Sequence, residues 1–364
     1  MKKMTIGHID THLSWRGGQK QVIALIKGLN KLGQRNILFC KDSSEIAQKA
    51  VQNGMEVITI PFKGEWDLVS AYKLRSHIKK ENLDILHTHT SHAHTHAIFA
   101  LMGLDRCKLV VSRRVDFHIQ NYFSRKYKYG KRVDKIIAVS NAIKRVLVED
   151  GVDPDLVVVV MSGFVPGTFE RNEKTEYLRK QLGIPDNAQV VSTVAALAPH
   201  KAHFVLLKAA KIIVNKHPEV KFILAGEGEM RPEIEKNIKS LELEDSVTML
   251  GFVENVGAVY KASNIFAISS EEEGLCTSIL DAMYFALPIV ATKAGGIPEL
   301  VHDGINGFIV PVNDHNSFAE KVNFLIESPE IEKKMGLRST EILKQNTIDN
   351  TIQKTFDVYK ELCC

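Results

Sequence analysis

The stretch that decides the fold runs from Ile265 to Met283 and reads IFAISSEEEGLCTSILDAM. Its first four residues predict a short buried strand, and a helix is expected after Gly274. Three acids and a glycine connect the two, so Glu273 is expected near the free N–H groups of the helix N-terminus. Asp281 should then lie about two turns along that helix, roughly on the same face. The plain alternative is an acidic helix start with a solvated aspartate.

The same alternation of apolar runs and helical patterns extends outward in both directions. Strands are expected at 4–9, 35–40, 56–60, 84–87, 109–112, 136–139 and 156–161, and again at 190–195, 220–225, 246–250, 265–268, 289–291 and 307–310. Apolar strands that alternate with helices are typical of a parallel sheet covered on both faces. The polar segment 166–189 separates the two sets, so we expect two doubly wound domains with ligands at the carboxyl ends of their strands.

Composition excludes several classes of protein. The chain has 364 residues, and 47 basic against 43 acidic residues give a net charge of +4. That excess is too small to indicate a nucleic-acid partner, although it suits an anionic substrate. Five cysteines without CxxC spacing predict reduced thiols and a cytoplasmic location. No apolar run reaches the roughly 20 residues that span a bilayer, and the first ten residues do not resemble a signal peptide.

Two glycine-rich turns follow expected strands. Gly17 and Gly18 open a helix after the first strand, and Gly226-Glu227-Gly228 follows the strand at 220–225. Glycine lets a backbone approach a ligand closely, and a helix N-terminus favours an anion, although a plain tight turn explains each pair equally well. Arg231 stands where the last glycine of a dinucleotide fingerprint belongs, which disfavours a dehydrogenase.

The run from Ser270 to Gly307 combines an acid–Gly pair, a second acid eight residues later, Ala-Met, Pro-Ile-Val-Ala, Gly-Gly, Pro-Glu, Asp-Gly and Asn-Gly. Together with both glycine turns and the segment Ala138–Asn141, it resembles the family-four glycosyltransferases over nearly the whole chain. The resemblance implies the α/β GT-B fold, in which two doubly wound Rossmann-like domains face a central cleft. Residues 1–165 would bind the acceptor, 166–345 would bind the nucleotide sugar, and a last helix in 346–364 would return to the first domain.

The resemblance also implies roles for single residues. Glu273 would hold donor-sugar hydroxyls, Lys201 would bind the leaving phosphate, and His89 would face the reacting sugar; these are the expected catalytic residues. The expected donor site comprises Gly17, Gly18, Gly226, Lys201, Glu273, Gly274, Leu275, Cys276, Thr277 and Asp281. Asp281 replaces the family's usual glutamate. Ala196 replaces a usual arginine, for which His200 or Arg16 is the expected substitute.

These residues suit the departure of a nucleoside diphosphate. A lysine, backbone N–H groups and helix ends stabilise the charge that develops on it. The family's front-face attack, in which the phosphate takes the acceptor's proton, needs no separate base, metal or cofactor. Arg16, Arg113 and Arg114 are expected to bind an acidic acceptor, with a salt bridge at the core edge as the alternative for the last two.

The expected function is therefore a retaining, metal-independent, hexosyltransferase-like reaction from a nucleotide sugar to a glycan or lipid-linked acceptor. The opening Trp-Arg-Gly-Gly-Gln resembles bacterial members that build cell-surface glycans, so lipopolysaccharide, capsule or another envelope polysaccharide is the expected product. A sugar-nucleotide epimerase and a non-catalytic nucleotide-sugar-binding protein are the alternatives.

Two further signals are discounted. Five histidines between His87 and His96 suggest a metal tract, but they have no cysteine or acidic neighbour, so surface or cleft positions and no metal are expected. The basic run Arg125–Arg132, interleaved with tyrosines, is either a solvated helix face or a peripheral contact with anionic lipid of the inner membrane.

Overall fold

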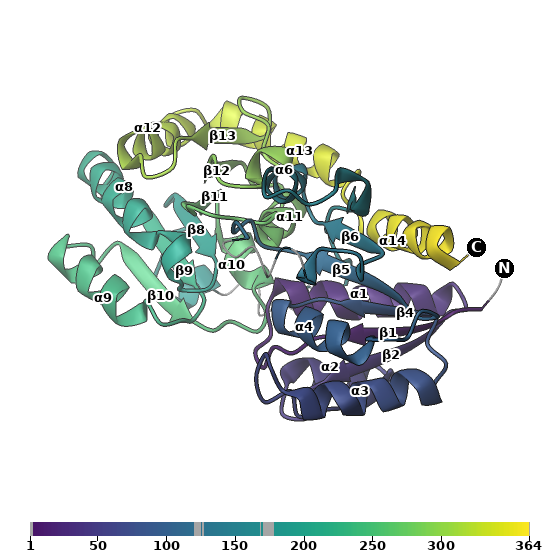
Figure 1. Ribbon diagram of the computed structural model, residues 1–364. Coiled ribbons are helices and arrows are strands. Elements are labelled where there is room, and N and C mark those ends of the chain that lie inside the picture. Colours follow the sequence, from purple (N-terminus) through teal and green to yellow (C-terminus); the bar gives the residue numbers. More distant parts are fainter. Residues whose placement is uncertain (1–2, 120–124, 126, 168, 170–177, 364) are drawn as a thin grey trace. The chain divides into compact units, whose positions relative to one another are not determined.

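The computed structural model describes residues 3–119, 125, 127–167, 169 and 178–363. The chain forms two compact units, of which the first comprises Met1–Val165 and Thr347–Cys364 and the second Pro166–Asn346. Each unit contains one parallel sheet with helices around it (Figure 1). The segment 166–189, expected from sequence to join the domains, lies partly outside the described residues.

The first unit is built on a seven-stranded sheet in the order β3-β2-β1-β4-β5-β6-β7, in which neighbouring strands pair in parallel. Its strands are β1 Thr5–Ile9, β2 Arg35–Cys40, β3 Glu56–Thr59, β4 Ile85–Thr88, β5 Lys108–Arg113, β6 Lys135–Ala138 and β7 Val157–Val159. Its helices are α1 Gly17–Lys31, α2 Glu45–Gln52, α3 Leu68–Lys80, α4 Ser91–Ala100, α6 Asn141–Glu149, η1 Pro154–Leu156 and α14 Ile348–Cys363.

The second unit has a six-stranded parallel sheet in the order β10-β9-β8-β11-β12-β13. Its strands are β8 Val190–Val194, β9 Lys221–Ala225, β10 Val247–Gly251, β11 Ile265–Ile268, β12 Ile289–Thr292 and β13 Gly307–Val310. Its helical segments are α7 Leu178–Gln181, η3 Pro199–Lys201, α8 His203–Lys216, α9 Arg231–Ser240, α10 Gly257–Ala262, α11 Thr277–Tyr284, η4 Ile297–Glu299, α12 His315–Ile326 and α13 Pro329–Leu343.

Both sheets reverse their strand order at one point. In the first unit β1 lies beside β4, and in the second β8 lies beside β11. Doubly wound sheets bind ligands outside the carboxyl ends of the strands at such a switch point. The residues that follow these four strands are therefore the ones to examine for a site.

The C-terminal helix α14 belongs to the first unit, where Figure 1 draws it in yellow. Its buried face, which includes Ile352, Phe356 and Tyr359, shares one core cluster with residues of α1 and of the sheet. Gly28 in α1 permits this contact, because a Cβ there would lie 2.2 Å from Cδ1 of Ile352. The last helix therefore completes the core of the unit in which the chain begins.

The strands lie where the apolar runs predict them, with shifts at their ends. The largest shift is in the expected strand at 156–161, which shortens to β7 because Pro154–Leu156 forms a 3-10 turn before it and pairing with β6 ends at Val159. Within the described residues, no helix has the length and apolar character that crossing a membrane requires.

Candidate functional site

In the second unit the turn after β8 and the loop after β11 are joined by backbone contacts. The hydroxyl of Ser269 lies 3.1 Å from the carbonyl oxygens of both Lys201 and Ala202, to which it donates. The backbone N–H of Glu271 donates to the carbonyl of His200 over 2.8 Å. These bonds hold the two segments together at the switch point of the sheet.

The same contact brings together the two charged residues predicted to be catalytic. Nζ of Lys201 forms an ion pair with Oε1 of Glu273, and the hydroxyl of Ser270 donates to that oxygen over 2.9 Å. Glu273 is 8% exposed and the Lys201 side chain 15%, so water screens the pair only weakly. The site therefore has an acid and a base, 72 residues apart in sequence, at one sheet edge.

Helix α11 begins later than the sequence suggests. Its first residue is Thr277, and Cys276 before it has a left-handed backbone with a φ of +63°. Glu273 therefore lies in the loop before the helix, and Asp281 is the fifth residue of α11, so the prediction that Asp281 lies two turns along the helix is wrong. The left-handed backbone of Cys276 separates this loop from the helix.

The loop that carries Glu273 is mostly buried. Gly274, Leu275 and Cys276 are buried, and Thr277 and Asp281 are half-buried. Burial, and next the charge of Glu273, raise the pKa of the Cys276 thiol to about 12. That thiol is protonated at neutral pH and is no nucleophile.

Asp281 lies near the buried ring of Tyr260. Its charge is the second cause, after burial, of the raised pKa of Tyr260. The hydroxyl of Tyr260 is already used, because it donates to the carbonyl of Ser278 over 3.2 Å. Asp281 lies in the second turn of α11. Its expected contact with the ribose of the nucleotide remains a prediction.

The glycines after β9 have a packing role. Gly226 has a φ of +147°, and a Cβ there would lie 1.8 Å from the carbonyl oxygen of Ala195. A Cβ on Gly228 would lie 2.3 Å from the oxygen of Leu197. Both glycines thus let this turn approach the segment that leads to Lys201, and the expected contact of Gly226 with a donor remains a prediction.

In the first unit the glycine pair lies at the start of α1. Arg16 is the N-cap residue and makes no side-chain capping bond, and Gly17 and Gly18 are the first helical residues. A Cβ on Gly18 would meet only Cδ of Arg114 at 3.7 Å, which is ordinary contact. The protein's own packing therefore does not require glycine at position 18, in contrast to position 226.

The side chains of Gln19 and Asp10 form a buried bond behind this glycine pair. Nε2 of Gln19 donates to Oδ2 of Asp10 over 3.0 Å, and the N–H of His12 donates to Oδ1 over 2.9 Å. Burial raises the pKa of Asp10, against the opposing effect of these bonds and of the nearby Arg114 charge. Sequence reasoning did not single out Asp10 or Gln19.

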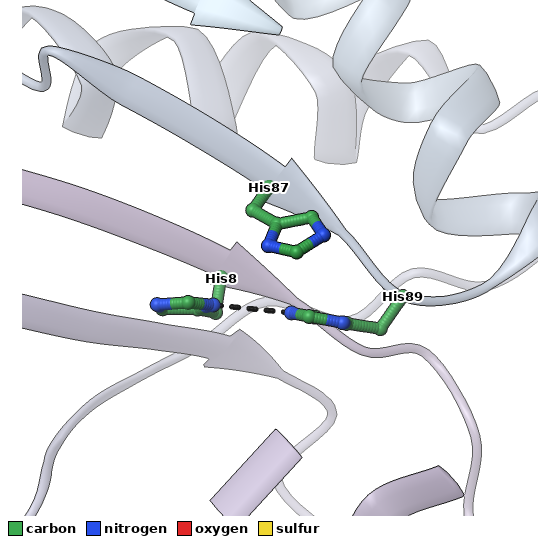
Figure 2. Close-up of side chains that lie close together, drawn as sticks. All are labelled: His8, His87 and His89. Atoms are coloured by element: carbon green, nitrogen blue, oxygen red, sulfur yellow. Dashed lines mark hydrogen bonds between the residues drawn. The ribbon is translucent and has the colours of Figure 1, made fainter. Parts of the chain in front are cut away.

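Histidines gather at the switch point between β1 and β4 (Figure 2). The cross-strand neighbours His8 and His87 are buried, as is His89, which follows β4. His87 and His89 are two residues apart and so point to the same face of the strand. We call these three residues the histidine cluster. Each offers a ring nitrogen, and the nitrogens lie within 4.8 Å of one another, as in groups that can hold a metal ion.

The expectation that the five histidines lie at the surface or in a cleft is wrong for four of them. His87, His89, His94 and His96 are buried, and among the five only His92 is exposed. Helix α4 turns His94 and His96 inward, where their rings pack on Tyr129 and Phe62 at 5.3 and 5.0 Å between centroids.

The two arginines expected at the acceptor both have contacts within the first unit. Arg113 donates to the hydroxyl of Tyr129 over 3.1 Å and to the carbonyl of Phe117. Nη1 of Arg114 donates to the hydroxyl of Ser162 over 3.3 Å. Burial lowers the pKa of Arg114 to about 10, so its guanidinium stays charged at neutral pH. The expected salt-bridge alternative is replaced by hydrogen bonds in both cases.

The basic run is largely engaged by the protein. Lys128 forms an ion pair with Glu65, and Arg125 donates to the carbonyl of Asp150 over 2.9 Å. Arg132 donates to the carbonyls of Leu104 and Cys107 over 3.0 and 3.1 Å. Arg125, Lys128 and Arg132 thus have partners within the first unit, whereas Lys131 is exposed and residue 126 lies outside the described part of the chain. The contact of this run with anionic lipid stays a prediction.

The residues that sequence reasoning missed have one signal in common. His8 and Asn36 belong to strands next to β4 or β1, and Ser269 and Ser270 follow β11 directly. Polar residues inside or just after otherwise apolar strands are unusual in a parallel sheet buried on both faces. That departure from the apolar pattern was the available indication.

Comparison with known proteins agrees with this architecture. Residues 174–341 match the family model "Glycosyl transferases group 1", and residues 15–165 match "Glycosyltransferase Family 4". The chain is 25% identical to the UDP-Gal:alpha-D-GlcNAc-diphosphoundecaprenol alpha-1,3-galactosyltransferase of Escherichia coli over 97% of each chain. It is 27% identical to the N-acetyl-alpha-D-glucosaminyl L-malate synthase of Bacillus anthracis, over 76% of this chain and 74% of that one.

Solved structures show the same fold. HepE of Anabaena, crystallised with UDP and glucose, superposes with a TM-score of 0.88 at 22% identity, over 98% of this chain and 100% of that one. A glycosyltransferase from Rickettsia africae superposes with a TM-score of 0.85 at 22% identity, over 100% and 99%. Two matching family models that together span most of the sequence, and two Rossmann-like sheets, lead to one assignment: the chain belongs to the family-four glycosyltransferases with the GT-B fold.

Proposed function

We propose that this glycosyltransferase is a retaining, metal-independent hexosyltransferase of bacterial envelope polysaccharide synthesis, such as that of lipopolysaccharide or capsule. Its donor would be a nucleotide sugar and its acceptor a glycan or lipid-linked sugar. The observation that carries the proposal is the Lys201–Glu273 pair at the switch point of the second sheet. The relatives add support, since one is named for a UDP-galactose donor and a diphosphoundecaprenol acceptor, and HepE was crystallised with UDP-glucose.

The chemistry follows from what the pair can bind. Breaking a sugar–phosphate bond places negative charge on the departing diphosphate, and a fixed ammonium such as Lys201 stabilises it. A phosphate near Nζ competes with the carboxylate of Glu273 for the same cation. The oxygens of Glu273 then become available to accept hydrogen bonds from sugar hydroxyls, so phosphate and sugar binding favour each other.

The first experiment is a thermal-shift screen of the full chain against UDP-glucose, UDP-galactose, UDP-N-acetylglucosamine and GDP-mannose, with UDP and glucose as separate controls. A ligand present at 100 times its Kd stabilises the folded state by about 2.7 kcal/mol. At least one nucleotide sugar should raise the melting temperature, and Glu273→Gln should reduce the rise from the sugar nucleotide more than that from UDP. If no nucleotide raises it, the proposed donor site is wrong.

The second experiment tests the reaction itself. Incubation of the best donor with lipid-diphosphate-linked sugar acceptors should give a product with the donor's anomeric configuration, read by NMR, and the rate should not change with EDTA. Conversion of the donor alone into its epimer would indicate an epimerase instead. Binding without turnover across the acceptor panel would favour a non-catalytic protein.

A lipid-linked acceptor implies a location at a membrane, and the start of α3 has suitable side chains. Trp66, Leu68, Val69, Tyr72 and Met102 are 60–74% exposed, and we call these five residues the α3 patch. Two contacts connect α3 and the segment before it with α4 and the residues after it: Trp66 packs on Phe99 of α4, and Arg75 of α3 donates to the carbonyl of Met102. Lys63 and Lys73 beside it are exposed, and aromatic side chains with neighbouring cations suit an anionic bilayer surface.

A further inference from the structure

The histidine cluster of the first unit is connected to Asn36 by hydrogen bonds. Nδ1 of His8 lies 3.1 Å from Nε2 of His89, and Nε2 of His8 lies 3.0 Å from Oδ1 of Asn36. Figure 2 shows the bond between the two imidazoles, whose rings stack with 14° between their planes. All three residues are at most 5% exposed.

The hydrogen bonds of Asn36 determine which atoms donate and which accept along this chain. Nδ2 of Asn36 donates to the backbone carbonyl of Gln34 over 3.2 Å and to Oδ1 of Asn30 over 2.8 Å. A backbone carbonyl only accepts, so the amide nitrogen must point there and Oδ1 must face His8. Oδ1 of Asn36 is an acceptor, and Nε2 of His8 must therefore carry the proton.

The same reasoning passes through the two imidazoles. Burial lowers the pKa of His8 to about 4 and that of His89 well below the usual value, so both rings are neutral. A neutral imidazole has one N–H, and with the proton on Nε2 of His8 its Nδ1 is an acceptor. Nε2 of His89 then donates to it, which leaves Nδ1 of His89 as a bare acceptor.

That last nitrogen is the one without a partner in the histidine cluster. Nδ1 of His89 is buried and has no hydrogen bond from any described residue. The two nitrogens of His87 are engaged, with Nδ1 2.5 Å from the hydroxyl of Tyr359 and Nε2 2.8 Å from that of Ser112. A buried acceptor without a donor is costly, and such groups are often completed by a ligand.

We propose that Asn36 and His8 are positioning residues that fix the tautomer of His89, so that its Nδ1 accepts a hydrogen bond from a hydroxyl group of the sugar substrate. The inference rests on the proposed function for the identity of that hydroxyl, but the tautomer itself is a property of the free protein. Asn36 does not contact a reacting atom, and it acts on the tautomer of His89 through the imidazole of His8.

The competing explanation is a metal ion held by the histidine cluster. A metal would bind Nδ1 of His8 and Nε2 of His89, both of which would then be deprotonated, and Nδ1 of His89 would carry the proton. The hydrogen-bond chain predicts the opposite proton positions for His89. The two explanations therefore differ at atoms that NMR observes directly.

The test is the ring-nitrogen spectrum of the full chain labelled with 15N-histidine, without ligand, in which His89→Gln assigns the signals of His89. We expect Nε2 of His89 to be protonated and Nδ1 to be bare, with no change on addition of one equivalent of zinc chloride. A protonated Nδ1, or a stoichiometric shift with zinc, would overturn the proposal. The measurement depends on His89→Gln for assignment only, and it does not require the Asn36 and His8 variants to fold.

The variants then test the relay. Asn36→Leu should give a mixture of both His89 tautomers, and Asn30→Ala is the matched control, because it removes a hydrogen bond from Asn36 and leaves Oδ1 on His8. His8→Asn keeps an oxygen near the place of Nδ1 and should preserve the wild-type tautomer, whereas His8→Leu should not. An unchanged tautomer in Asn36→Leu, or an equal change in Asn30→Ala, would refute the relay.

Turnover of UDP-glucose, followed as UDP release, gives the functional arm. Asn36→Leu should lower kcat/KM about three- to tenfold, as expected for one lost neutral hydrogen bond, and Asn30→Ala should leave it unchanged. If Asn36→Leu gives a mixture of the two His89 tautomers but turns over at the wild-type rate, the link between the tautomer and the substrate is wrong. If the wild-type protein neither binds nor turns over any nucleotide sugar, the proposed function fails while the tautomer result stands.

Discussion

The ion pair between Lys201 and Glu273 allows a prediction that separates folding from catalysis. Lys201→Met keeps the length of the side chain and removes its charge, so the carboxylate of Glu273, which is 8% exposed, keeps the hydroxyl of Ser270 as a hydrogen-bond donor. Glu273→Gln keeps the shape and leaves the ammonium unpaired from that carboxylate. Each single variant removes one charge of the pair, and the double variant removes both.

The expected magnitudes differ between the two single variants. Removing one partner of a buried pair costs about 3–5 kcal/mol, and we expect about 3 kcal/mol for Lys201→Met because the pair is not fully buried. Glu273→Gln should cost only about 1–2 kcal/mol, since the 15%-exposed lysine can extend its long stem toward water. The double variant should cost no more than about 2 kcal/mol, so that the coupling free energy is roughly 2–3 kcal/mol.

Urea unfolding can measure the loss of stability for each unit separately. Both tryptophans, Trp15 and Trp66, belong to the first unit, so their fluorescence follows that unit while far-UV circular dichroism follows the whole chain. The variants should lower the urea midpoint by circular dichroism. Lys211→Met is the matched control in the second unit, because its pair with Glu242 is exposed and should be worth under about 1 kcal/mol.

Activity completes the cycle. The double variant should recover most of the stability lost in Lys201→Met and still lack transferase activity, because both charges that are proposed to bind the donor are gone. Additive destabilisation would show that the two charges do not interact in solution. Near wild-type turnover by a folded Lys201→Met protein would refute the role of this lysine in stabilising the leaving group.

The remaining predictions concern glycine geometry, charge substitution, acid stability and lipid binding. In urea unfolding, Gly226→Ala should destabilise the second unit by about 2 kcal/mol or more, because its Cβ meets a carbonyl oxygen at 1.8 Å. Gly18→Ala should change the free energy of unfolding by under about 0.5 kcal/mol, so any loss of turnover in this variant would come from impaired ligand binding. If His200 supplies the charge of the family's usual arginine, in whose place this chain has Ala196, then His200→Ala should lower turnover more than Arg16→Ala does. The reverse result would assign that role to Arg16. Because the histidine cluster is neutral when folded and an unfolded histidine binds a proton below about pH 6.5, acidification from pH 7 to 5 should destabilise the first unit, and urea midpoints by tryptophan fluorescence that are independent of pH would contradict this. Trp66→Ser in the α3 patch should reduce co-flotation with phosphatidylglycerol vesicles, and unchanged flotation would exclude that surface.

The fold was predictable because its signal is local. Apolar runs of four to six residues with helical patterns between them are sufficient to predict buried parallel strands, and the runs at 265–268 and 307–310 coincide with β11 and β13. Strand ends were less predictable, since a cap or turn of one or two residues decides them. Cys276 is the clearest example, because its left-handed backbone delays the start of α11 to Thr277.

The site was predictable only one residue at a time. Glu273 follows a strand directly and Lys201 was identified by the resemblance to the family, but their pairing depends on β8 lying beside β11. The glycines illustrate the opposite difficulty: Gly18 and Gly226 look alike in sequence, although backbone packing requires glycine only at position 226. The approach of a distant segment decides this, and a single sequence does not report it.

The two units stabilise buried polar groups at their switch points in different ways. In the second unit, polar groups at the switch point are stabilised as opposite charges, so Lys201 and Glu273 offset each other until a more strongly charged group arrives. In the first unit the histidine cluster is buried and its pKa values are lowered, so the groups there stay neutral. A paired cation suits a diphosphate, whose charge outcompetes a single carboxylate. A neutral imidazole nitrogen suits a hydroxyl group, because it can accept the hydroxyl proton whereas an imidazolium cannot. The division predicts that salt should weaken nucleotide binding, which depends on charge, while selectivity among sugars of one nucleotide should be largely independent of ionic strength.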